Sequence, residues 1–254
     1  MALNWKSAQK NEKKFWEDIY VNDKQDDVYS KSNNGGWELF TLEVLERHKV
    51  DINFLNDKII LDLGSGPAGV AKGLEMLFEK NILKNISIIA VDPLMDFYKN
   101  EIGILKESSN LKLLNNKGEN IDIPDNSVDI IFSTNVLDHC ENPEDVIKEC
   151  FRILKPGGLF LPSLHLIYDY LKPVSKLIKY FDKNHPHHFV MSSMKKKFNK
   201  SLFECDVVSK YSIREDQKLF SFRNIFRSKD KLRAFKRYLS NYVLYTCYFL
   251  IKKK

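Results

Sequence analysis

An apolar run that leads directly into a glycine-rich turn constrains this chain more than any other feature. Residues 60–69 read ILDLGSGPAG, with glycines at positions 64, 66 and 69. A short apolar run of this kind predicts a strand that is buried on both faces, as in a parallel sheet. The glycines let the turn approach a ligand closely, with backbone N–H groups pointing into the crevice. The turn therefore predicts a binding site at the end of a buried strand.

Strand and helix patterns alternate from residue 58 to residue 166. The glycine-containing stretch 155–158 is expected to end a helix. This alternation predicts an α/β fold with a doubly wound, mostly parallel sheet. We expect strands at 58–63, 86–91, 111–114, 127–133 and 159–166, and helices at 69–83, 94–106 and 143–154.

The flanking segments predict further elements. Amphipathic patterns indicate helices at 5–20 and 37–50. Residues 205–213 have the pattern of a strand, and residues 223–240 that of a strongly basic helix. The Val, Tyr, Thr and Phe content of residues 242–251 favours a final strand, with an interfacial membrane helix as the alternative.

Length and composition are typical of one large domain. The chain has 254 residues, of which 43% are hydrophobic and 29% charged, so it can bury a core. No run approaches the roughly 18 apolar residues of a membrane span, and the first fourteen residues lack the apolar stretch of a secretory signal. The four cysteines are widely spaced and form no CxxC pair. We therefore expect free thiols and a cytoplasmic location.

Charge is distributed unevenly along the chain. Residues 1–164 carry 19 Lys and Arg against 27 Asp and Glu, a net charge of −8, whereas residues 165–254 carry 21 against 7, a net charge of +14. The acidic part should not attract a polyanion, and we expect no nucleic-acid partner. The basic part is compatible with a phosphate-bearing ligand, with peripheral membrane contact or with a solvated lysine-rich face.

An acidic residue precedes the glycine turn. Gly64, Gly66 and Gly69 satisfy the GxGxxG spacing of dinucleotide sites, which alone is weak evidence. Asp62 lies two residues before the first glycine, where its carboxylate would repel a pyrophosphate but would suit a ligand with an ammonium and a sulfonium group. Asp62 therefore argues against a nicotinamide-dependent dehydrogenase.

A second acidic residue ends the second predicted strand. Asp92 follows Gly69 by 23 residues, where it can accept hydrogen bonds from both hydroxyls of a ribose. Pro93 and Leu94 then offer an apolar wall for a purine. The alternative is that Asp92 only caps the following helix.

Together with two further segments, these motifs resemble a known family. The four segments are 60–69, 88–94, 118–139 and 154–160, the last reading LKPGGLF. In this order they resemble the class I S-adenosylmethionine-dependent methyltransferases, in particular the small-molecule branch that includes ubiquinone-biosynthesis-type enzymes. The resemblance is close over residues 58–166. It implies a seven-stranded, Rossmann-like sheet with an antiparallel last strand, a helical cap, and S-adenosylmethionine as the cofactor.

The resemblance also suggests how the chain is divided. A single methyltransferase domain would span residues 1–254, with a cofactor-binding core at 51–166. The segment 1–50 would form an N-terminal helical lid, residues 167–240 a cap with the basic helix, and residues 241–254 the final strand. The lid and the final strand match the family only loosely.

The resemblance implies which residues hold the cofactor. Asp62 and the turn would hold its methionyl part, Asp92 its ribose and Leu94 its adenine. The full set of expected cofactor-binding residues is Asp62, Gly64, Ser65, Gly66, Gly69, Asp92, Pro93, Leu94, Gly118, Glu119 and Asn135.

Two positions depart from the family pattern. Ala68 stands where glycine is common, although the adjacent Gly69 can relieve the crowding. Lys117 stands near a position where an acid often contacts the adenine amino group, so Glu119 would have to substitute for it.

Histidines are the candidate bases. Methyl transfer from a sulfonium requires alignment, exclusion of water and, for a hydroxyl acceptor, removal of a proton. A neutral imidazole suits that last task near pH 7. The alternatives are a divalent metal held by the histidine cluster or a purely structural role for these residues. We predict no resident metal and name as candidate bases His139, His165, His187 and His188, with His185 in the same HPHH segment.

The acceptor is predicted less directly. The stretch DPLM at 92–95 and the HPHHF segment resemble bacterial methyltransferases of sugar and polysaccharide modification. A hydroxyl of a sugar, nucleotide-sugar or glycan is therefore the expected small-molecule acceptor. The alternatives are a lipid or quinone ring methylated at a membrane surface and a non-catalytic cofactor-fold protein. A nucleic-acid methyltransferase is disfavoured, because residues 133–136 read STNV and lack the tetrapeptide of base amino-group methylation.

Overall fold

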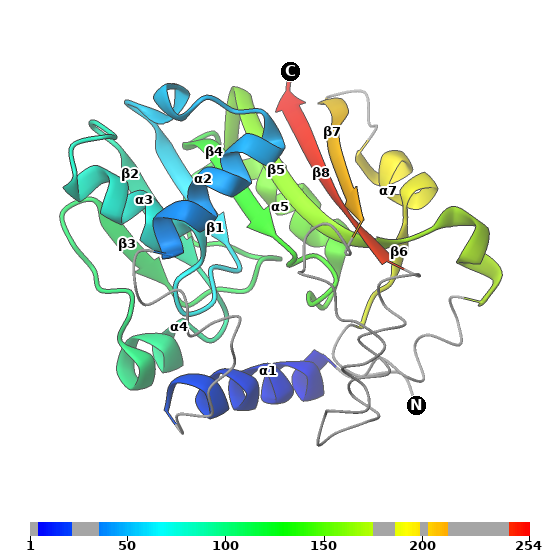
Figure 1. The fold of residues 1–254 in the computed structure, drawn as a ribbon, viewed down its shortest axis with the longest axis horizontal. Helices are drawn as coiled ribbons and strands as arrows, with labels where there is room; N and C mark the ends of the chain where they lie inside the picture. Colours follow the sequence, from blue (N-terminus) through cyan, green and yellow to red (C-terminus); the bar gives the residue numbers. More distant parts are fainter. Residues whose placement is uncertain (1–4, 22–35, 175–185, 199–202, 213–243) are drawn as a thin grey trace.

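The chain forms a central sheet with helices on both faces, seen in the computed structural model in Figure 1. The structure describes residues 5–21, 36–174, 186–198, 203–212 and 244–254. The predicted basic helix at 223–240 and His185 lie outside the described residues.

Seven strands follow one another across the sheet, and only the last strand of the chain runs against its neighbours. The order is β3-β2-β1-β4-β5-β8-β7, with the short β6 paired to the end of β5. The first five strands of this order are parallel, and β8 is antiparallel to both β5 and β7. The expected doubly wound sheet with an antiparallel last strand is confirmed. The strands are β1 (Ile59–Leu63), β2 (Ser87–Val91), β3 (Leu111–Leu114), β4 (Val128–Thr134), β5 (Leu154–Ile167), β6 (Phe189–Val190), β7 (Phe203–Ser212) and β8 (Leu244–Lys253).

Alternation along the central strands separates two apolar cores. In β1, Leu61 and Leu63 belong to one core, whereas Ile60 belongs to the other. The first core is completed by α5 (Pro143–Ile153), and the second by α2 (Gly36–His48) and α3 (Gly69–Glu79). A strand buried on both faces has no polar side to turn toward water, which explains the continuous apolar run in the sequence.

Close packing between α2 and α3 depends on a glycine. A Cβ at Gly73 would lie 2.1 Å from Oγ1 of Thr41 and 2.3 Å from the carbonyl oxygen of Trp37. The Thr41 hydroxyl donates to the carbonyl of Val70 at 3.2 Å. The helix that begins at the glycine turn is thereby held against α2.

Several predicted boundaries need correction. The helix expected at 94–106 is only α4 (Met95–Phe97) followed by η3 (Tyr98–Ile102), a π-helical segment that ends at Gly103 with φ of +70°. The helix expected at 69–83 ends at Glu79. Strand β5 already begins at Leu154, and residues 155–158 bulge from it, because Val128 pairs with Leu154 but Ile130 pairs with Leu159. The remaining short elements are η2 (Ile52–Leu55), η4 (Asp169–Val174) and α7 (Met191–Phe198).

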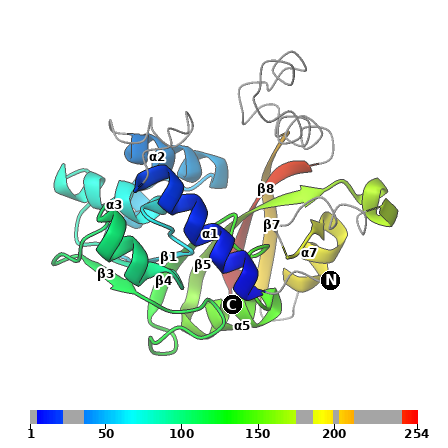
Figure 2. The ribbon, with the colours of Figure 1, turned by 90° about the horizontal axis from the view of Figure 1, so that it is seen from below.

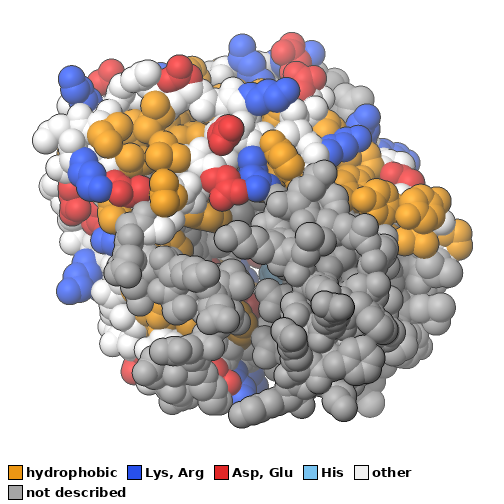
Figure 3. Space-filling model, in the orientation of Figure 1, with side chains coloured by type: hydrophobic (Ala, Val, Ile, Leu, Met, Phe, Trp, Pro, Cys, Tyr) orange, Lys and Arg blue, Asp and Glu red, His pale blue; other side chains and the backbone are white. Residues whose placement is uncertain are grey.

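The N-terminal helix α1 (Trp5–Tyr20) crosses the edge of the sheet at which the parallel strands end (Figures 1 and 2). Figure 3 shows apolar side chains at the surface among charged ones, and Leu39 of α2 is 69% exposed. Within the described part of the chain, no helix is long and apolar enough to cross a membrane.

Candidate functional site

A cavity of about 700 Å³ opens at the carboxyl ends of β1, β2 and β4, under α1. Its volume is within the roughly 300–1,000 Å³ range of small-molecule sites. Open α/β sheets bind ligands at this edge. The predicted site residues that line the cavity are Asp62, Gly64, Ser65, Gly66, Gly69, Asp92, Pro93, Gly118, Glu119, Asn135, His139 and His165.

The glycine turn adopts a conformation that side chains would disturb. Gly64, Gly66 and Gly69 have φ of +66°, +57° and +51°. The N–H of Gly64 donates to the carbonyl of Val91 at 2.7 Å, which ties the turn to the end of β2. A Cβ at Gly64 would lie 2.5 Å from Cγ2 of Val136. The backbone of the turn can therefore border the cavity directly only because these positions are glycine.

Asp62 is a buried carboxyl at the end of β1. Its side chain accepts a hydrogen bond from the N–H of Ala71 at 2.8 Å, in the first turn of α3. Burial raises the pKa of Asp62 to about 7; the N–H donors of Ala71 and Val70 oppose that shift, and the charge of Asp92 adds to it. Desolvation penalises the ionised form, and a positive ligand charge would relieve that penalty.

Asp92 bridges two backbone segments. Its Oδ2 accepts from the N–H of Gly66 at 3.1 Å, and its Oδ1 accepts from the N–H of Leu94 at 2.8 Å. Burial raises the pKa of Asp92 to about 7, and the charge of Glu12 contributes to the rise. The contact with Leu94 closes the turn before α4 but does not cap that helix, whose N-cap residue is Leu94 itself, and the Asp92 carboxyl faces the cavity. Leu94 is not among the residues that line the described cavity, and its N–H contacts the carboxyl of Asp92.

The opposite end of the cavity is bounded by the loops after β3 and β4. The Glu119 carboxylate accepts from the N–H of Asn142 at 2.9 Å, at the start of α5. Lys117 pairs with Glu141 at 2.9 Å, and its Nζ lies 3.9 Å from the centre of the Trp5 ring. Glu119 therefore holds the loop while Lys117 contacts α1.

Buried oxygens at the end of β4 are available to a ligand. Within the described chain, Oγ1 of Thr134 and Oδ1 of Asn135 are buried and make no hydrogen bond. Both residues line the cavity. Buried polar groups normally have partners, so their place here suits a ligand that donates hydrogen bonds. Two buried carboxyls, a glycine cradle and these oxygens together fit a polar, positively charged ligand.

The structure separates the candidate histidines into two groups. His139 and His165 line the cavity, and Nδ1 of His165 lies 3.1 Å from Oγ1 of Thr246 in β8. His187 and His188 are not among the lining residues. The N–H of His187 donates to the carbonyl of Asp138 at 3.2 Å, and its Nε2 lies 3.0 Å from the carbonyl oxygen of Cys140. His187 therefore anchors the loop after β4 from outside the cavity.

A metal site is not formed by the part of the chain that the structure describes, where no three His, Cys, Asp or Glu side chains are grouped to hold an ion.

The sequence predicted residues 1–50 as a helical lid but named none of the residues of α1 and α2 that line the cavity. The cavity is also lined by Trp5, Glu12, Phe15 and Trp16 of α1 and by Trp37 and Phe40 of α2. Positions 5, 8, 12 and 16 repeat at helical spacing on one face of α1, and the apolar residues among them, Trp5, Ala8 and Trp16, could have indicated a face turned toward a ligand.

Comparison with known proteins agrees with this geometry. A family model described as a methyltransferase domain matches residues 61–161. Over these residues the chain is similar to the class I S-adenosylmethionine-dependent methyltransferases. Members of this family use S-adenosylmethionine as their cofactor, and the donor set described above fits it.

Curated relatives share part of their length with this chain. A malonyl-[acyl-carrier protein] O-methyltransferase of Marinomonas is 28% identical over 154 residues, which are 60% of this chain and 55% of the relative. A sterol 24-C-methyltransferase of Pneumocystis carinii is 27% identical over 129 residues, 51% of this chain and 31% of the relative. The chain spans about half or less of the length of the curated relatives it matches.

Solved structures share the fold. A phosphoethanolamine N-methyltransferase of Haemonchus contortus, in complex with S-adenosylhomocysteine, superposes with a TM-score of 0.57 at 15% identity, covering 84% of this chain and 52% of that one. The [4+2]-cyclase SpnF superposes with a TM-score of 0.57 at 16% identity, covering 85% and 80%. Such identities establish the fold of the methyltransferase domain and nothing about its acceptor.

Proposed function

We propose that this chain binds S-adenosylmethionine in the cavity under α1 and transfers its methyl group to a small-molecule acceptor. The observation that carries the proposal is the pair of buried carboxyls, Asp62 and Asp92, on adjacent parallel strands with the glycine turn between them. A pyrophosphate would be repelled there, whereas ammonium and ribose hydroxyl groups would be held.

Each part of the cavity matches one part of the cofactor. Asp62 and the turn, with Ser65 in it, would hold the methionyl group, and Asp92 would accept from the ribose hydroxyls. Pro93, Gly118 and Glu119 would border the adenine, with the backbone of Leu94 fixing Asp92. Asn135 would complete the methionyl end with its buried Oδ1.

The residues of the chain align the cofactor and the acceptor, enclose them and remove a proton from the acceptor. When bound, S-adenosylmethionine supplies a methyl group on a positively charged sulfur. The aromatic face of α1 lies over the cavity and excludes water, which is a requirement for such a transfer. His139 or His165 takes the proton of a hydroxyl acceptor, because both line the cavity.

A sugar-type hydroxyl is the first candidate acceptor. Trp37 and Phe40 give the cavity an aromatic wall, and such walls stack against the apolar faces of sugar rings. A phosphate-bearing acceptor would suit the net charge of +14 in residues 165–254.

A lipid-type acceptor is the second candidate. Curated relatives include a sterol methyltransferase and malonyl-[acyl-carrier protein] methyltransferases. The aromatic wall would receive an apolar chain equally well, and basic residues beyond 165 would favour an anionic membrane surface.

The proposed division of the chain follows the cavity. We propose residues 1–50 as the lid, 51–166 as the cofactor-binding core, 167–240 as a cap and 241–254 as the final strand. The position of α1 over the cavity supports the lid.

Calorimetric titration with S-adenosylhomocysteine and, separately, with NAD tests the proposal. We expect the first ligand to bind and Asp92→Ala to abolish that binding, with the exposed Asp122→Asn as the control. Binding of NAD alone, or unchanged binding to Asp92→Ala, would overturn the proposed site. Incubating the protein with labelled cofactor and extracts of soluble sugars or of lipids then separates the two acceptor classes.

A further inference from the structure

Helix α1 places a carboxylate over the middle of the crevice. Trp5, Glu12 and Trp16 repeat on one helical face, and all three line the cavity. Trp5 meets Lys117 at the end assigned to adenine. Trp16 lies at the glycine turn, where a Cβ at Gly66 would be 3.8 Å from its Cζ2. Glu12 stands between these two anchors.

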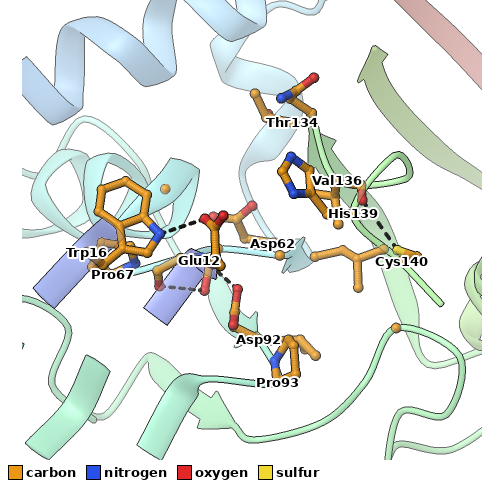
Figure 4. Close-up of a pocket in the computed structure, with 18 of the residues that line it drawn as sticks. Glu12, Trp16, Asp62, Pro67, Asp92, Pro93, Thr134, Val136, His139 and Cys140 are labelled. Atoms are coloured by element: carbon orange, nitrogen blue, oxygen red, sulfur yellow. Dashed lines mark hydrogen bonds between the residues drawn. The ribbon is translucent and has the colours of Figure 1, made fainter. Parts of the chain in front are cut away.

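A chain of contacts through Gly66 and Trp16 connects Asp92 with Glu12. The N–H of Gly66 donates to Asp92 at 3.1 Å, and the indole of Trp16 lies over Gly66. The Nε1–H of Trp16 in turn donates to Glu12 at 2.8 Å. Figure 4 shows the Glu12 side chain beside Asp62 and Asp92. The indole therefore fixes Glu12 above the carboxyl that we assign to the ribose.

The electrostatic effect of Glu12 reaches into the cavity. Its charge adds to burial in raising the pKa of Asp92, and after burial and the charge of Asp92 it raises the pKa of Tyr98. The charge of Asp92 also adds to burial in raising the pKa of Asp62. With α1 over the cavity, the carboxyl of Glu12 lies near those of Asp62 and Asp92, and the three negative charges repel one another. A positively charged ligand would offset this repulsion, whereas a neutral ligand would not.

We propose that Glu12 makes the closed position of α1 selective for a positively charged cofactor, so that methyl transfer itself weakens the hold of the lid on the product. This inference rests on the proposed function. In the transfer, the bond from sulfur to the methyl carbon breaks and its electron pair stays on sulfur. A new bond forms from the acceptor atom to that carbon, and the acceptor proton passes to the base. The sulfur changes from a cationic sulfonium to a neutral thioether, and the attraction of Glu12 is lost with that charge.

The test compares the affinity of the full chain for charged and neutral cofactor analogues. Calorimetry would use S-adenosylmethionine, an unreactive analogue with an amine-bearing carbon in place of the methylated sulfur, and neutral S-adenosylhomocysteine. We expect the wild-type chain to prefer the two charged ligands about 10-fold, which corresponds to about 1.4 kcal/mol. Glu12→Gln should reduce the preference to about 3-fold or less, and Glu12→Asp should retain most of it.

Glu17→Gln is the matched control, because Glu17 is an exposed carboxylate on the same helix outside the cavity. It should leave the preference unchanged. A second measurement, hydrogen exchange of α1, should show stronger protection with the charged amine analogue than with S-adenosylhomocysteine in the wild-type chain and equal protection in Glu12→Gln.

The two proposals fail in different ways. If neither ligand binds the wild-type chain, the proposed function is wrong. If both bind but the preference is absent, or is the same in Glu12→Gln, the cofactor site stands and the role of Glu12 is wrong.

Discussion

The carboxylate of Asp62 lies in the space that a side chain at Gly69 would occupy. A Cβ added to Gly69 would lie 2.5 Å from Oδ2 of Asp62, the oxygen that accepts from the N–H of Ala71. The last glycine of the turn is therefore needed for the position of the carboxylate as well as for its own φ of +51°.

Gly69→Ala should displace that carboxylate and lower the affinity for S-adenosylhomocysteine by about 10-fold or more, since a charged hydrogen bond contributes about 1.5–3 kcal/mol. Calorimetry measures the loss. Gly103→Ala is a matched control, because Gly103 also has a positive φ, of +70°, but a Cβ there meets nothing within 4 Å. Equal losses of affinity in both variants would show that backbone strain, and not Asp62, is responsible.

The stability of the ligand-free chain should fall as pH rises from 6 to 8. Asp62 and Asp92 have folded pKa values of about 7, above their ordinary value of 3.8. Each group binds its proton more tightly in the folded chain, so its contribution is full below pH 3.8 and is lost as pH rises through 7. The slope can reach about 1.4 kcal/mol per pH unit for each carboxyl.

Urea unfolding at pH 6, 7 and 8 measures this slope. Asp92→Asn should reduce it, and the exposed Asp122→Asn should not. An unfolding free energy that is independent of pH over this range in the wild-type chain would contradict the assignment.

A second titratable group, His48, should affect the stability of the chain at acidic pH. His48 of α2 is buried between Phe132 and Tyr248, with ring centroids 6.4 and 5.0 Å away, and burial lowers its pKa from 6.5 to about 4. The unfolded chain binds the proton more tightly, so the contribution of His48 to stability is full above pH 6.5 and is lost as pH falls toward 4. Asp62 and Asp92 act in the opposite direction over this range in both proteins, so the measured quantity is the difference between them. Urea unfolding at pH 6.5, 5.5 and 4.5 should show that the unfolding free energy of the wild-type chain falls relative to that of His48→Gln as pH decreases. Parallel curves for the two proteins would argue against it.

Substitution of His139 should lower turnover but leave cofactor affinity nearly unchanged. This residue lines the cavity beyond the cofactor-binding turn, so His139→Ala should leave the affinity for S-adenosylhomocysteine within about 2-fold and lower turnover about 100-fold, the typical contribution of a general base. Formation of S-adenosylhomocysteine with an acceptor identified from the extracts measures turnover. His187→Ala is the comparison, because that ring contacts the backbone of Cys140 outside the cavity and should affect mainly stability. Unchanged turnover in His139→Ala would leave His165 as the candidate base.

The sequence contained most of the core of this site because local patterns determine it. The run from Ile60 to Gly69 predicted a strand, a turn and a carboxylate at its end, and the structure has all three. The acid at position 92 lies at the next strand end for the same reason: parallel strands bring their carboxyl ends to one edge.

The parts of the site that the sequence did not predict depend on contacts between distant segments. Nothing in the local pattern of α1 shows that Glu12 and Trp16 meet Gly66 and Asp92, more than 45 residues away, because that depends on how the helix docks. Residue type alone makes His187 a candidate base, and only the folded chain shows that its Nε2 lies beside the carbonyl oxygens of Cys140 and Glu141. The π-helical segment at Tyr98–Ile102 also replaced a helix that propensity favoured, since it ends in a left-handed glycine only five residues on.

The antiparallel β8 lies between β5 and β7, with Cys247 opposite Leu164 on one side and opposite Lys210 on the other. During synthesis, β5 and β7 both leave the ribosome before the strand that joins them. Until residues 244–253 are synthesised, β5 and β7 each have a strand edge without its hydrogen-bonded neighbour. A chain that stopped before these residues would expose both edges to pairing with other nascent chains. Completion of the sheet is in this sense a late event, although the glycine turn, Asp62 and Asp92 emerge before β5, β7 and β8.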